Sequence, residues 1–133
     1  MKNAMTEIFG EVIYSYSRAE AIKDEVLVDL GQDEEMAAVC REHYKYPIAC
    51  TAAVFSIIER AVNNRKWCND YAGILHDMLW MSRVFARKVD DHTRIFRVKI
   101  TGAGRRSLYD FKIVCGPGDD AEPVLTIMLP IED

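Results

Sequence analysis

The sequence predicts an α+β fold in which a long central helix and shorter helices pack on an antiparallel C-terminal sheet, with a short N-terminal strand. Two observations carry this prediction. Apolar residues recur at helical spacing between Asp70 and Val89, whereas apolar and polar residues alternate from Phe96 onward, as in half-buried strands. We expect the 133 residues (1–133) to form a single domain, because a chain of this length can bury a sizeable core.

The N-terminal region predicts a strand, a short helix and a second extended segment. β-Branched and aromatic residues favour a strand over Glu11–Tyr16. Ser17 and Glu20 then have the spacing of a capping box, which predicts a helix over Arg18–Asp24. An apolar run at Val26–Val28 predicts a brief extended segment after that helix.

Two further helices are predicted before the central one. Asp33 is the expected N-cap of the first, because two acidic residues that suit a helix N-terminus follow it. Pro47 disfavours helical backbone at Tyr46, so we expect an extended chain there. Thr51 is the expected N-cap of the other of these two helices, which reaches Val62.

The central helix is predicted from Asp70, its N-cap, to Val89. Its apolar arc is too broad for a single neighbour to cover, so we expect the helix to lie between a sheet and other helices. One apolar stripe consists of Ile74, Met78, Met81, Phe85 and Val89.

Three strands are predicted after the central helix. Alternation over Phe96–Ile100 and again over Tyr109–Ile113 predicts two antiparallel strands joined by a glycine-rich turn. Val124–Leu129 is apolar on both faces, which predicts a strand in the middle of the sheet or under a helix.

Composition and charge limit the classes of function. Half of the residues are hydrophobic and 29% are charged, which is typical of a globular protein. A net charge of -4 argues weakly against general nucleic-acid binding, which usually requires a basic surface. No apolar run approaches the roughly 20 residues that span a bilayer, and the first residues lack the apolar core of a secretory signal. We therefore expect no membrane partner and a cytoplasmic location.

The cysteines have no spacing typical of a metal site. They are widely and irregularly separated, without a CxxC pair, and we expect them to be buried small hydrophobic residues in a reducing compartment. The four are Cys40, Cys50, Cys68 and Cys115. No cofactor or metal site is predicted.

The densest polar-aromatic set lies near the N-terminus. Tyrosine and arginine are favoured at binding hot spots because they combine apolar area with a polar tip. Alternation sends Tyr14 and Tyr16 to the same face of the expected strand, beside Arg18, and Tyr46 belongs to the same class of residue. These side chains suit either a contact surface or the edge of the core.

His76 precedes Asp77 on the central helix, and a histidine beside a carboxylate is a candidate general base or metal ligand. Adjacent helical residues point about 100° apart, however, so Asp77 cannot orient the imidazole. No second histidine follows at ligand spacing on the same helical face. A packed or solvated histidine is the simpler interpretation, with a place in a ligand pocket as the alternative.

Two turns carry charge. The loop before the second predicted strand contains Arg105 and Arg106, which together with backbone amides suit a phosphate or an acidic partner. Neither the Rossmann nor the P-loop pattern is present. Asp119 and Asp120 lie in the turn before the last strand, where turn chemistry explains them without a metal.

Several stretches resemble a family of small proteins of unknown function that are encoded by bacteria, their phages and plasmids. They are Phe9–Leu30, Tyr44–Val54, Leu75–Arg83 and Cys115–Pro130, and the resemblance as a whole extends over most of the chain. The family leads us to expect a glycine where this chain has Glu25. The resemblance implies an accessory gene of a mobile element, and it assigns no catalytic residue.

The leading hypothesis is a non-enzymatic protein that binds another protein through the Tyr16–Arg18 stretch and the acidic turn. The alternative is a small enzyme or ligand-binding domain with a pocket lined by Tyr14, Tyr16, Arg18 and His76. Nucleic-acid binding through the basic loop is third, and a homodimer through a sheet edge is a further possibility.

Overall fold

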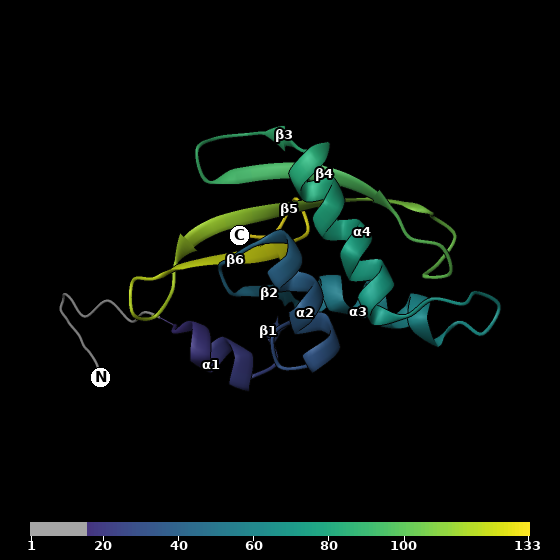
Figure 1. Cartoon of the computed structure of the whole chain (residues 1–133), viewed down its shortest axis with the longest axis horizontal. Coiled ribbons are helices and arrows are strands. Elements are labelled where there is room, and N and C mark those ends of the chain that lie inside the picture. Colours follow the sequence, from purple (N-terminus) through teal and green to yellow (C-terminus); the bar gives the residue numbers. More distant parts are fainter. Residues whose placement is uncertain (1–15) are drawn as a thin grey trace.

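The computed structural model describes residues 16–133 (Figure 1). Tyr14 and the predicted strand Glu11–Tyr16, apart from its last residue, lie outside the described residues. The elements are α1 (Arg18–Lys23), β1 (Leu27–Asp29), α2 (Glu34–His43), β2 (Ile48–Thr51), α3 (Ala52–Asn63), α4 (Tyr71–Val84), β3 (Arg87–Lys88), β4 (Thr93–Lys99), β5 (Leu108–Pro117) and β6 (Pro123–Met128). The predicted α+β class is confirmed.

The strands form one sheet in the order β1-β2-β6-β5-β4-β3. Strands β4, β5 and β6 are antiparallel neighbours, as predicted, with Phe96 opposite Phe111. Strand β6 also pairs with β2 in parallel, with Ile48 opposite Leu125, so the sheet is mixed. The prediction that β6 is a middle strand is therefore confirmed.

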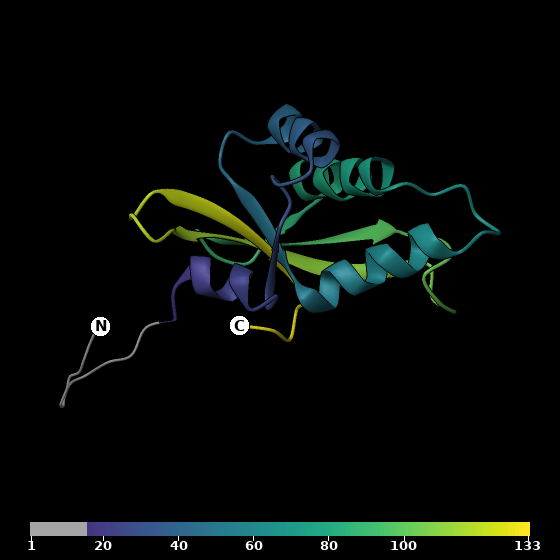
Figure 2. The same ribbon diagram turned by 90° about the horizontal axis from the view of Figure 1, so that it is seen from below.

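Helices cover both faces of the sheet. Figure 2 shows α2 and α4 on one face and α1 and α3 on the other. The main core lies under α4, where Met78 and Leu79 are fully buried with Phe96 and Phe111 of the sheet. Because α2 packs beside α4, the central helix contacts both the sheet and another helix.

The predicted caps are confirmed. Asp33, Thr51 and Asp70 each accept a hydrogen bond from the third residue of the helix that follows. Ser17 and Glu20 form the complete capping box of α1. These contacts depend on four consecutive residues, so the local sequence is enough to predict them.

The central helix is shorter than predicted. It ends at Val84, and Phe85 and Val89, the last two members of the predicted stripe, are 66% and 51% exposed. Arg87–Lys88 instead pairs with the start of β4 as strand β3, so strand pairing overrides the helical periodicity there. Strands β2 and β3 were not predicted.

The end of α1 explains the glycine that the family pattern leads us to expect. The Val26 amide donates to the Ala21 carbonyl, and the Glu25 amide donates to the Ile22 carbonyl, which is a Schellman motif. Glu25 has φ +63° and is therefore in the left-handed region that favours glycine. The turn is kept, with a strained residue in the glycine position.

Replacing Glu25 by glycine is expected to stabilise the protein by about 0.5–1 kcal/mol. Relief of the left-handed backbone, worth roughly 1–2 kcal/mol, exceeds the extra entropy that glycine loses on folding, about 0.5–1 kcal/mol. Urea unfolding measures this difference. The control is Glu59→Gly on the exposed side of α3, which should destabilise by about 1 kcal/mol. A Glu25→Gly protein that is less stable than the parent contradicts the strain argument.

The predicted burial of the four cysteines is only partly confirmed. Cys40 and Cys50 are buried, Cys115 is partly buried, and Cys68 is exposed. The prediction that all four are buried is therefore wrong for Cys68, which lies in the polar connection between α3 and α4. Burial raises the pKa of Cys40 to about 11 and that of Cys50 to about 12.

Iodoacetamide at pH 8 is expected to label Cys68 first in the native protein. Cys40 and Cys50 should react only after unfolding, because they are buried and their raised pKa values leave almost no thiolate at that pH. Peptide mass spectrometry at successive times gives the order. Labelling of Cys50 as fast as Cys68 would show that the core opens readily.

Candidate functional site

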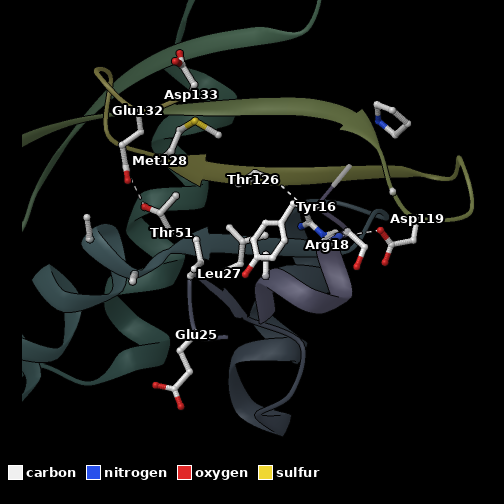
Figure 3. A pocket seen from close by; sticks show the side chains of 17 residues that line it. Tyr16, Arg18, Glu25, Leu27, Thr51, Asp119, Thr126, Met128, Glu132 and Asp133 are labelled. Atoms are coloured by element: carbon white, nitrogen blue, oxygen red, sulfur yellow. Dashed lines mark hydrogen bonds between the residues drawn. The ribbon is translucent and has the colours of Figure 1, made fainter. Parts of the chain in front are cut away.

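A groove of about 1070 Å3 lies on the face of the sheet that carries α1. We call it the α1 groove. It is bounded by α1, the start of α3, strand β6, the β5–β6 turn and the segment after β6 (Figure 3). Its lining includes Tyr16, Arg18, Val26, Thr51, Thr126 and Glu132. Three of the predicted site residues meet there: Tyr16, Arg18 and Asp119.

The Arg18 side chain is fixed against strand β6. Its Nη1 donates to Thr126 Oγ1 and its Nη2 to the Leu125 carbonyl, both at 2.8 Å. Burial lowers the pKa of Arg18, while the neighbouring carboxylates, Asp29 first, oppose this change. Two of the three guanidinium nitrogens are thus committed to the fold, and Arg18 forms part of the wall of the groove.

Asp119 joins the β5–β6 turn to the start of α1. Its Oδ1 accepts from the Arg18 amide at 2.8 Å and its Oδ2 from the Ala19 amide at 3.0 Å. These amides belong to the first turn, whose N–H groups have no partner within the helix. The negative charge also suits the positive end of the helix.

The segment after β6 closes the side of the groove next to α3. Glu132 Oε1 accepts from Thr51 Oγ1 at 2.8 Å (Figure 3), and it also accepts from the Leu129 amide at 2.7 Å. Thr51 is also the N-cap of α3. The carboxylate therefore holds this segment beside the start of that helix.

The α1 groove is acidic with an apolar rim. Among residues 16–133, its lining contains one cation, Arg18, and four carboxylate side chains: Glu25, Asp119, Glu132 and Asp133. Tyr16 and Val26 are 46% and 51% exposed at its edge. The Tyr16 hydroxyl donates to Asp24, which orients the ring beside α1. Negative charge around exposed apolar surface suits a ligand that is basic and partly apolar.

The other predicted residues do not join this groove. His76 lies on α4, on the opposite face of the sheet, so the predicted pocket that combined it with Tyr16 and Arg18 is not formed. Tyr46 lines a separate cavity of about 240 Å3 that it shares with His92. Asp120 lies in the β5–β6 turn outside the lining of the α1 groove.

Arg105 and Arg106 line a second groove, of about 940 Å3, which we call the basic groove. It lies where the α3–α4 and β4–β5 connections meet, at the end of the molecule away from α1 (Figure 1). Among the described residues, its lining contains five cations and no carboxylate: Arg60, Lys66, Lys99, Arg105 and Arg106. Trp67 is 48% exposed beside them. The run Arg65-Lys66-Trp67 was a signal for this surface that the sequence analysis did not use.

The basic groove has a fixed backbone. Gly102 has φ +92°, and a Cβ there would lie 2.8 Å from Trp67 Cδ1. Asn64 Nδ2 donates to the Gly102 carbonyl at 3.0 Å, and Asn69 Nδ2 donates to the Thr101 carbonyl at 2.7 Å. The two connections are therefore locked together, and glycine is required at their closest approach.

The structure also brings His76 beside a second histidine. His43 Nε2 lies 2.9 Å from His76 Nδ1, although the two residues come from α2 and α4. Helix α4 itself carries no second histidine. Nothing local in the sequence predicts which helices pack together, so this pair was missed.

Comparison with known proteins gives a family without an assigned activity. The model of a family of unknown function (DUF6573) matches residues 2–133. The chain belongs to DUF6573. This agrees with the resemblance to an uncharacterised family that the sequence motifs predicted. Neither a curated protein nor a solved structure matches the chain.

None of the helices in residues 16–133 of this DUF6573 protein has the length and hydrophobicity needed to cross a bilayer.

Replacing Asp119 by alanine is expected to destabilise the protein by about 1–2 kcal/mol, because two first-turn amides of α1 lose their acceptor. Hydrogen exchange of the Arg18 and Ala19 amides should accelerate. The matched control is Asp120→Ala, whose carboxylate makes no hydrogen bond or ion pair with a described residue and should change stability by less than about 0.5 kcal/mol. Equal effects of the two substitutions would contradict the capping role.

Proposed function

We propose that this DUF6573 protein is a non-enzymatic binding protein whose α1 groove takes a basic, partly apolar segment of another protein. The observation that carries the proposal is the lining of that groove, in which, in the part of the chain that the structure describes, four carboxylates accompany one arginine that is already engaged. Charge complementarity of this kind selects the partner and its orientation. Tyr16 and Val26 supply apolar area at the rim.

The commitment of polar groups to the fold supports binding over catalysis. Arg18, Asp119 and Glu132 each hold a structural hydrogen bond, so their positions are set before a partner arrives. A preorganised surface loses less side-chain entropy on association. The α1 groove would therefore act as a rigid docking surface.

The resemblance to proteins of bacteria, phages and plasmids suggests where to seek the partner. In this proposal the chain is an accessory protein of a mobile element, and its partner is a host protein or one encoded by the element. Only the resemblance supports this setting, and the chemistry of the groove supports only the character of the partner's surface.

A second candidate function is binding of a small molecule in the same groove. Its volume, about 1070 Å3, is at the upper end of the range of ligand pockets. A small ligand would raise the melting temperature in a concentration-dependent way, whereas a protein partner would be captured in stoichiometric amount. The acidic lining favours a cationic compound in this case too.

Affinity capture from a bacterial lysate tests the protein-partner proposal. We expect one stoichiometric protein, bound less tightly at high salt. Glu25→Gly should weaken capture by about threefold to tenfold through loss of a groove carboxylate, although it stabilises the fold. Because stability and binding change in opposite directions, unfolding cannot explain the loss.

Glu35→Gln is the matched control, because it removes an exposed carboxylate from α2 on the opposite face of the sheet. Capture should be unchanged by this variant. A partner that both variants bind as tightly as the parent would move the binding surface away from the α1 groove.

A further inference from the structure

The α2–α4 interface carries a second cluster, on the face of the sheet opposite the α1 groove. His43 Nε2 lies 2.9 Å from His76 Nδ1, and Glu42 Oε1 lies 3.9 Å from the same His76 atom. One ligand atom from each residue lies within 4.8 Å of the other two. Glu42 and His43 end α2, and His76 lies in the middle of α4, so packing of the two helices brings the three residues together.

The hydrogen bonds fix the proton positions. Arg83 Nη1 lies 2.8 Å from His43 Nδ1, and a guanidinium can only donate. His43 Nδ1 is therefore an acceptor, and the proton of the neutral ring is on Nε2, which donates to His76 Nδ1. The His76 Nδ1 lone pair thus points into the cluster.

The environment of His43 favours the neutral form of its ring. Burial lowers its pKa first, and the neighbouring His76 and Arg83 lower it further, while Glu42 raises it. A neutral imidazole is the form that binds metals.

We propose that Glu42, His43 and His76 form a binding site for a divalent transition metal, of which zinc is the best match. Imidazole and carboxylate groups bind zinc at about 2.0–2.2 Å in tetrahedral geometry. Such bonds place ligand atoms about 3.3 Å apart. Two of the observed separations, 2.9 and 3.9 Å, lie on either side of this value, and all three atoms lie within 4.8 Å of one another, so rotations of three side chains at the surface complete the site.

Proton transfer during binding is balanced within His43. The Nε2 proton passes to water, water returns a proton to Nδ1, and the Nε2 lone pair then binds the metal, so the ring changes tautomer and stays neutral with no net release of a proton. A water molecule takes the fourth position on the metal. Magnesium and calcium prefer oxygen ligands, so a site with two imidazoles selects against them.

Arg83 acts against the metal. When His43 carries its proton on Nδ1, that atom no longer accepts from Arg83, so the guanidinium must move away. Its positive charge also opposes a cation. The site is therefore weakened by a neighbouring residue that is exposed and able to swing aside, and its removal should strengthen binding.

Isothermal titration with zinc chloride alone tests the proposal, using protein in which exposed Cys68 is changed to serine so that its thiol does not bind the metal. We expect one zinc per chain. His43→Ala and His76→Ala should each weaken binding by at least about tenfold, because loss of an outer-shell partner alone already costs that much. Glu42→Gln should weaken it less, and Arg83→Gln should tighten it about twofold to fivefold, the effect of one surface charge.

The third histidine of the chain provides the control. His92 lies in the β3–β4 turn and lines a different cavity, so His92→Ala should leave zinc affinity unchanged. Because the ligands join α2 to α4, zinc should also raise the melting temperature of the parent but not of His76→Ala. Equal zinc affinity in the parent and in His76→Ala, or tighter binding by Arg83→Gln that survives His76→Ala, would overturn the proposal.

Discussion

Strand β6 must hydrogen-bond along both edges and bury both faces, and the rest of the molecule is arranged around this requirement. It pairs in parallel with β2 from the first half of the chain and antiparallel with β5 from the second half. Leu125 and Ile127 contribute to the core cluster. Thr126 and Met128 line the α1 groove on the other face. The core and the proposed binding surface are therefore two sides of one strand.

The wall of that groove is a helix too short to be stable alone. Helix α1 has six residues, and isolated helices of this length do not form in water. It is held at its start by the capping box and by Asp119, and at its end by the Schellman turn at Glu25. Arg18 then attaches it to β6. Loss of any one of these contacts would loosen both the helix and the groove.

What the sequence could predict depended on the distance between interacting residues. Caps at Asp33 and Asp70 and alternation in β4 and β5 are local patterns, and all were predicted correctly. Strand β2 is defined by its pairing with β1, about twenty positions earlier, and with β6, more than seventy positions later. The end of α4 was predicted wrongly for a different reason: the apolar periodicity continues to Val89, whereas Arg87–Lys88 pairs with the start of β4 only a few residues later.

The sites follow the same rule. Tyr16 and Arg18 were predicted as neighbours because they are close in the chain, and the acidic turn was singled out for its charge. Asp119 caps the helix that begins at Arg18, about a hundred residues earlier in the chain. This contact could be identified only from the folded structure. The contact between His43 and His76 was not predicted for the same reason, because the two residues lie on different helices. The residue types that could act in a site were recognisable in the sequence, whereas the contacts that bring them together were not.

The two grooves place opposite charges in separate parts of the molecule, a separation that its net charge of -4 conceals. Carboxylates gather in the α1 groove and cations in the basic groove near the far end (Figure 1). A charged partner that approaches from solution is therefore oriented as well as attracted before it makes contact. Screening over about 8 Å at physiological ionic strength confines this alignment to the last steps of the encounter. The rate at which complexes form, more than their lifetime, then depends on salt.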